Sequence, residues 1–216
     1  MGAYFLCFGD IMKKLTAYFS KGEWTLWGSS SALILISFLL FDRVNTMTLA
    51  ASLIGVTSLI FNAKGNPIGQ ALMILFSLLY GLISYTFSYY GEMITYLGMT
   101  APMALFALIT WLRNPFGENR AEVAVNQITR TELLGALALT ALVTFVFYFI
   151  LDYFETANII PSTLSVTTTF IAVYLTFRRS PYFALAYAAN DVVLILLWAM
   201  AAAEDISYLS VLICFV

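Results

Sequence analysis

The chain consists largely of apolar runs that are each close to the length of about 20 residues that an α-helix needs to cross a bilayer. Seven such runs can be separated by their polar loops: 24–41, 46–63, 68–90, 93–112, 133–151, 160–177 and 181–203. Hydrophobic residues make up 62% of the sequence and charged residues 10%, whereas soluble domains average about 25% charged residues. The sequence therefore predicts an all-α, polytopic membrane helical bundle.

The composition also bears on which sites the chain can contain. Histidine is absent, which removes the commonest zinc ligand and the usual general base. The two cysteines, Cys7 and Cys214, lie near opposite ends and indicate neither a disulfide framework nor a metal site. We therefore expect no catalytic residue, no metal and no cofactor. The net charge of −2 gives no reason to expect a nucleic acid partner.

The two ends of the chain differ from the long runs. In residues 1–23, apolar residues recur at helical spacing against lysines, which predicts an amphipathic helix lying on the lipid bilayer. Residues 24–45 supply an extra N-terminal membrane helix. The last run, 206–216, is too short to span a bilayer. We expect it to be a helix truncated at Val216 or a re-entrant segment.

Charged residues alternate between the loops. Lysine and arginine occupy one set of loops, at 13–21, Lys64, 113–130 and 178–179, and acids occupy the other, at Glu92, 152–155 and 204–205. Arg43 is the only lysine or arginine that departs from this pattern. Because cytoplasmic loops are enriched in lysine and arginine, the pattern predicts a cytoplasmic N-terminus.

A similar unit occurs twice along the chain. A short basic turn with a proline precedes a long helix at Lys64–Pro67 and again at Arg178–Pro181. We interpret 46–112 and 160–216 as two parallel three-helix repeats, joined by a cytoplasmic loop and an inverting linker helix within 113–159. Transporters built from such repeats bind their substrates near the membrane midplane, between the repeats.

Asp191 is the one acid that we expect inside an apolar run. Its distance along the helix from Pro181 places it about 15 Å deep, near the middle of a hydrocarbon core about 30 Å thick. Acids at this depth are costly and mark functional sites. Its neighbour Asn190 is the second candidate for substrate contact. Alternatively, the two residues form a hydrogen-bonded pair that fixes helix packing.

Polar and aromatic residues on the other helices indicate which faces point inward. The further candidates for substrate contact are Gln70, Ser77, Tyr96, Trp111, Thr167, Tyr187 and Trp198. Tyr187 and Trp198 align with Asp191, Thr100 shares a face with Tyr96, and Thr168 and Thr169 adjoin Thr167. Two alternatives remain open, because hydroxyl residues also hold membrane helices together and tryptophans also collect at the membrane interface.

Short motifs occur along most of the chain in a specific order. They are Ile54-Gly55-Val56, Phe61-Asn62-Ala63-Lys64-Gly65, Leu79-Tyr80-Gly81, Tyr90-Gly91-Glu92-Met93, Pro102 with Trp111, the helix from Thr163 to Phe177 ending in Arg178-Arg179, and Asn190-Asp191-Val192-Val193. Together they resemble the PnuC family of nicotinamide riboside transporters, over about residues 47–200. The resemblance implies a SWEET-like architecture, a homotrimer, and facilitated diffusion of nicotinamide riboside across the bacterial inner membrane with trapping by a cytoplasmic kinase.

Two alternative functions remain. Many relatives carry tryptophans before the acid of the seventh run, where this chain has Ala184 and Tyr187, so thiamine or riboflavin are alternative substrates. Nicotinamide riboside suits the residues well, because Asp191 and an aromatic face can hold its cationic ring and an amide can pair with its carboxamide. The rival class is an intramembrane enzyme that uses Asp191 as acid or base. We expect no second acid in the runs to support that chemistry.

Overall fold

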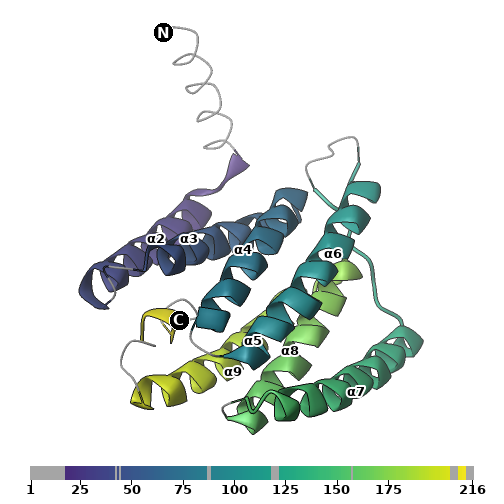
Figure 1. Cartoon of the computed structure of the whole chain (residues 1–216). Helices are drawn as coiled ribbons and strands as arrows, with labels where there is room; N and C mark the ends of the chain where they lie inside the picture. The colour runs from purple at the N-terminus through teal and green to yellow at the C-terminus, as the bar shows by residue number, and fades with distance from the viewer. Residues whose placement is uncertain are drawn as a thin grey trace, which may run out of the picture.

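The structure is a bundle of α-helices (Figure 1). It is a computed structural model, and it describes residues 18–41, 43, 45–86, 89–117, 122–156, 158–204 and 209–212. The elements are α2 (Lys21–Phe41), α3 (Thr46–Ala63), α4 (Pro67–Thr86), α5 (Tyr90–Ile94), η1 (Thr95–Thr100), α6 (Ala101–Arg113), α7 (Arg130–Tyr153), α8 (Ile159–Phe177), α9 (Phe183–Glu204) and α10 (Leu209–Leu212).

Each of the seven predicted apolar runs corresponds to a helical segment that is long and apolar enough to cross a membrane. The elements α5, η1 and α6 together form one of these segments. The predicted all-α membrane fold is therefore confirmed. Most of the predicted amphipathic helix, in residues 1–17, and the chain after Leu212 lie outside the described residues.

Two of the long helices begin with a capping box. In this motif the side chain of a hydroxyl residue accepts from the backbone N–H of a glutamate three positions later, and the side chain of that glutamate accepts from the backbone N–H of the hydroxyl residue. At α2, the Ser20 N–H donates to Glu23 Oε2 (2.7 Å) and the Glu23 N–H donates to Ser20 Oγ (3.2 Å). Thr129 and Glu132 make the same exchange at the start of α7. The first box makes α2 begin earlier than the predicted run at 24–41.

The basic turns that join α3 to α4 and α8 to α9 are built alike. Each contains a residue of positive φ just after the helix, Gly65 (φ 67°) and Arg179 (φ 57°). The next residues, Asn66 and Ser180, each donate a backbone N–H to a carbonyl in the last helical turn, at 2.9 Å in both cases. This ending satisfies carbonyl groups that a helix terminus leaves open.

One segment of the long loop after α6 makes hydrogen bonds to both basic turns. The Val123 N–H donates to the Gly65 carbonyl (2.9 Å) and the Asn126 N–H donates to the Arg179 carbonyl (3.0 Å). Arg179 Nη1 also donates to the Ala124 carbonyl (3.1 Å). Both turns therefore lie at the same end of the bundle, held by residues 122–126, which we call the linker segment.

Two ion pairs occur at this end of the described structure. Lys64 Nζ lies 3.2 Å from Glu23 Oε2, and Arg178 pairs with Glu132. Each glutamate belongs to the capping box that begins one helix. Its cationic partner lies just after the end of the helix that comes next in the sequence. The ion pairs thus attach the start of α2 to the α3–α4 turn and the start of α7 to the α8–α9 turn.

A wide helical turn separates α5 from α6. Pro102 has no backbone N–H and so cannot donate to the carbonyl one turn earlier, and the residues immediately before it form the π-helical turn η1. The Ala101 N–H accordingly donates to the carbonyl of Tyr96. Tyr96 and Thr100, both on this turn, are buried.

The two halves of the bundle meet where α6 and η1 pack on α8. Within the halves, α3 packs on α4 and α8 packs on α9. Helix α7 runs along the outside of α8 (Figure 1), and it exposes large apolar side chains such as Leu134 (68%) and Phe145 (63%). Such a surface is suited to lipid contact. The grouping into two equivalent three-helix repeats stays a prediction.

Candidate functional site

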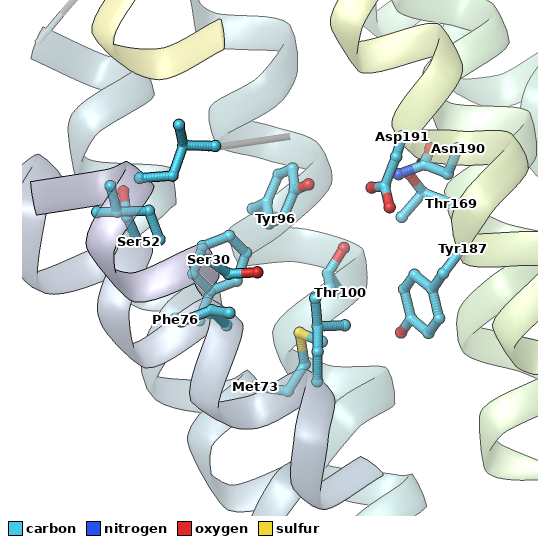
Figure 2. Close-up of a pocket in the computed structure, with 15 residues that line it drawn as sticks. Ser30, Ser52, Met73, Phe76, Tyr96, Thr100, Thr169, Tyr187, Asn190 and Asp191 are labelled. Atoms are coloured by element: carbon cyan, nitrogen blue, oxygen red, sulfur yellow. Dashed lines mark hydrogen bonds between the residues drawn. The ribbon is translucent and has the colours of Figure 1, made fainter. Parts of the chain in front are cut away.

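A cavity of about 260 Å³ lies between the two halves of the bundle (Figure 2). This volume is close to the lower end of the range of about 300–1,000 Å³ for small-molecule sites. Residues of α2, α3, α4 and η1 line one side, and residues of α8 and α9 line the other. The polar lining residues are Ser30, Ser52, Tyr96, Thr100, Thr169, Tyr187, Asn190 and Asp191.

Asn190 is held at the cavity by two threonine hydroxyls of α8. Thr168 Oγ1 and Thr169 Oγ1 lie 2.7 Å and 2.8 Å from Asn190 Oδ1, and Asn190 is only 2% exposed. In this orientation of the amide, Oδ1 accepts from both hydroxyls. The amide nitrogen has no hydrogen-bond partner among the described residues. Its N–H groups are therefore available to an acceptor on a bound molecule.

Asp191 directs its carboxylate into the same cavity (Figure 2). Within the described part of the chain it has neither an ion-pair partner nor a hydrogen-bond partner. The described residues that line the cavity include no lysine or arginine. An ionised Asp191 therefore leaves the cavity with an uncompensated negative charge, which favours a cationic ligand.

Helix α3 forms much of the opposite wall. Ser52, Gly55, Val56 and Leu59 all line the cavity, and their spacing places them on one face of the helix. A Cβ atom at Gly55 would lie 3.1 Å from the ring of Phe76, which also lines the cavity. Glycine at this position therefore leaves room for that ring.

Two tyrosines line the cavity from its two sides. Tyr96 on η1 is 4% exposed, and its ring packs on Tyr80 with the centroids 4.3 Å apart. Tyr187 lies on α9 one helical turn before Asp191, and its ring meets Phe183 edge to face at 6.4 Å. Aromatic faces close to an acid suit an aromatic or quaternary cation.

Residues 45–216 match the family described as nicotinamide mononucleotide transporters. The chain belongs to this family. A solved structure titled "Crystal structure of the Vitamin B3 transporter PnuC" is similar, with a TM-score of 0.76 and 20% identity, and the match covers 91% of this chain and 87% of that one. At this identity the likeness shows a shared fold. No curated protein sequence matches the chain. The predicted membership of the PnuC family is confirmed.

In this nicotinamide mononucleotide transporter family member, both tryptophan candidates lie away from the cavity lining. Trp198 is fully buried, and its Nε1–H donates to the Tyr80 hydroxyl (2.7 Å) within an aromatic cluster that includes Tyr89. Trp111 is 1% exposed, and its Nε1–H donates to the Thr176 carbonyl on α8 (2.9 Å). The first joins α4 to α9, and the second joins α6 to α8.

Three polar candidates also lie apart from the cavity lining. Gln70 is buried, and its Nε2 donates to Asn62 Oδ1 (2.8 Å) on the neighbouring helix. Ser77 donates to a carbonyl of its own helix (2.8 Å). The hydroxyls of Thr167 and Thr144 lie 2.9 Å apart, joining α8 to α7. The cavity thus brings together Tyr96, Tyr187, Asn190 and Asp191 from the predicted set.

Glu92, expected from the sequence in an external loop, lies inside the bundle. Helix α5 begins at Tyr90, earlier than the predicted run from Met93, so Glu92 falls on its first turn and is 1% exposed. Its Oε1 accepts a hydrogen bond from Ser165 Oγ (3.2 Å), and its Oε2 has no partner among the described residues. The prediction that Asp191 is the one acid inside the spans is therefore wrong. The predicted orientation does not depend on Glu92, because the positive-inside rule counts lysine and arginine.

The two acids do not share a site. Of Asp191 and Glu92, only Asp191 lines the cavity. In the part of the chain that the structure describes, no group of three His, Cys, Asp or Glu residues is placed to hold a metal ion. The lining residues that sequence reasoning missed are small or apolar ones, chiefly Ser30 and Ser52, which carry no signal that separates cavity lining from ordinary helix packing.

Proposed function

We propose that this protein carries nicotinamide riboside across the membrane by facilitated diffusion. The observation that carries the proposal is the unpaired carboxylate of Asp191 in a cavity between the two halves, beside the free N–H groups of Asn190. Nicotinamide riboside has a permanently cationic pyridinium ring, a carboxamide and ribose hydroxyls. Asp191 would offset the ring charge, Tyr187 or Tyr96 would offer an aromatic face, and Asn190 would donate to the carboxamide oxygen.

The family name refers to the mononucleotide, but the charges around the cavity favour the nucleoside. A phosphate monoester carries close to two negative charges at neutral pH, and the described lining residues offer it Asp191 and no lysine or arginine. Removing an unpaired ion from water costs several kcal/mol. We therefore propose that the riboside passes and the mononucleotide is excluded.

We also propose uniport in the bacterial inner membrane, with the N-terminus in the cytoplasm. Phosphorylation by a cytoplasmic kinase adds the charge that this cavity disfavours, so the product does not return by the same route. Net uptake then needs no ion gradient, because the chemical conversion removes the free riboside from the cytoplasmic side.

Flux measurements with purified protein in liposomes test the proposal, with protein-free liposomes as background. Labelled nicotinamide riboside should equilibrate without any ion gradient, and excess mononucleotide should not compete. Accumulation that requires a proton or sodium gradient would contradict uniport, and competition by the mononucleotide at equal concentration would contradict the proposed selectivity. Flux of thiamine or riboflavin without flux of the riboside would assign the protein to that vitamin instead.

A further inference from the structure

Helix α2 forms part of the wall of the cavity. Ser30, Leu33 and Ile34 all line it, and their spacing along the sequence places them on one face of the helix. From the sequence, 24–45 is expected to be an extra helix outside the two repeats. In the structure this helix brings side chains to the same cavity as Asn190 and Asp191.

The orientation of α2 is fixed by contacts with α3 and the turn that follows it. Glu23 pairs with Lys64 at the start of the helix, and Trp27 Nε1–H donates to Thr57 Oγ1 on α3 (3.1 Å). Residues three apart lie on the same side of a helix. The Trp27 hydrogen bond therefore helps to set the rotation that brings Ser30 to the cavity.

The hydroxyls of Ser30 and its neighbour Ser31 both lack a hydrogen-bond partner among the described residues, and of the two only Ser30 lines the cavity. A helical serine commonly donates back to a carbonyl of the preceding turn, as Ser29 does at 3.0 Å on this helix and Ser52 does at 2.7 Å on α3. The Ser30 hydroxyl has no such partner among the described residues. In Figure 2 it points into the cavity from the side opposite Asn190 and Asp191.

From this arrangement we propose that Ser30 contacts the substrate and that α2 recognises the ribose. The inference rests on the proposed function, in which Asp191 and Asn190 hold the pyridinium carboxamide. The ribose then extends across the cavity toward Ser30, whose hydroxyl can both donate to and accept from a ribose hydroxyl. Ser30 is thus a specificity-determining residue that distinguishes a riboside from its base.

Ser30→Ala tests this inference, and Ser29→Ala is its matched control on the exposed side of the same helix. Each purified protein is titrated with nicotinamide riboside and with 1-methylnicotinamide, which keeps the charged ring and the carboxamide but has no ribose. Ser30→Ala should weaken riboside binding about 2- to 12-fold, the range for one hydrogen bond, and should leave 1-methylnicotinamide binding unchanged. Ser29→Ala should change neither affinity.

The outcomes separate this inference from the proposed function. Parent-like riboside affinity in Ser30→Ala, or an equal loss for both ligands, would overturn the role of Ser30 and leave the proposed function standing. A parent protein that does not bind the riboside would overturn both. A second variant, Ser30→Cys in a protein with Cys7 and Cys214 replaced by serine, should react with a water-soluble thiol reagent and be protected by the riboside. Reaction without protection would also overturn the inference.

Discussion

Asn190 and Asp191 are adjacent in the sequence, but they offer a ligand different chemistry. The oxygen of Asn190 is occupied by the hydroxyls of Thr168 and Thr169, so this residue presents N–H donors. An ionised Asp191 can only accept hydrogen bonds. The first residue is therefore suited to a carbonyl oxygen and the second to a positive charge or a hydroxyl.

Substitution of each residue should have a separate effect on binding. Asn190→Ala should weaken the binding of nicotinamide riboside about 5- to 150-fold, which corresponds to about 1–3 kcal/mol for a specific buried hydrogen bond. Asp191→Asn keeps the shape and removes the charge, so it should weaken the cationic riboside more than neutral nicotinamide. Titration of purified, monodisperse variants measures both effects. If both variants bind like the parent, the pair has a structural role only.

Glu92 provides a prediction about stability. Its carboxylate accepts one hydrogen bond from Ser165 and leaves one oxygen without a partner among the described residues. Glu92→Gln keeps the acceptor without a charge, so its Tm should stay within about 2 °C of the parent value. Glu92→Ala loses the contact and should lower the Tm by about 2–10 °C. Thermal unfolding in detergent measures both, and equal destabilisation by the two variants would contradict this account.

The role of a single residue could be predicted from the sequence only where its polarity differs clearly from that of the residues around it. Asp191 could be recognised because an acid in the middle of a long apolar run is costly to bury and is rare outside functional sites. Glu92 was missed because it lies close to a break between helices, where an acid in a loop and an acid on a first helical turn look the same. Ser30 was missed because serine is common in membrane helices for packing reasons alone.

At the scale of elements, the wide turn η1 brings side chains to the cavity that its flanking helices α5 and α6 do not reach. A π-helical turn accommodates one residue more than an α-helical turn and is often found at functional sites. One extra residue rotates the preceding helix by about 100° relative to the following one. Tyr96 and Thr100 both lie on this turn and both line the cavity.

Pro102→Ala should alter this element without unfolding the protein. Alanine supplies the missing N–H, so a regular α-helical turn can form and Tyr96 would rotate away from the cavity. We expect riboside affinity to fall at least about fivefold, which is the effect of losing one hydrogen bond. The Tm should be unchanged or higher, because a proline inside a helix is destabilising. Pro161→Ala is the control, since proline is tolerated in the first turn of a helix. Parent-like affinity in Pro102→Ala would show that the wide turn does not position Tyr96.

At the scale of the whole molecule, the number and class of the spanning helices could be predicted, because hydropathy and length decide them. The way in which the linker segment joins the two basic turns could not be predicted. The N–H groups of its residues Val123 and Asn126 donate to the backbone carbonyls of Gly65 and Arg179, and any residue except proline can make such hydrogen bonds. Side-chain identity therefore gave no sign of them.

Orientation in the membrane remains a prediction at this scale. In a protein without other cysteines, Val125→Cys in the loop after α6 should react only from the cytoplasmic side, and Glu155→Cys after α7 only from the outside. The reason is the concentration of lysine and arginine at the first of these ends. Impermeant thiol reagents applied to sealed cells and to inverted vesicles make the measurement. Reactivity from the opposite sides would reverse the orientation.

The two ion pairs of the described structure give the molecule an unequal response to dissolved salt. Glu23 with Lys64 and Glu132 with Arg178 lie at the same end, with side chains 20–35% exposed. Charges that reach solvent are screened over a Debye length of about 8 Å at physiological ionic strength. A rise in ionic strength in the solution at that end would weaken the attachment of α2 and α7 to the basic turns. At the opposite end the described residues form no ion pair, so a rise in ionic strength there has no such attachment to weaken. The solutions on the two sides of the membrane therefore affect the protein differently.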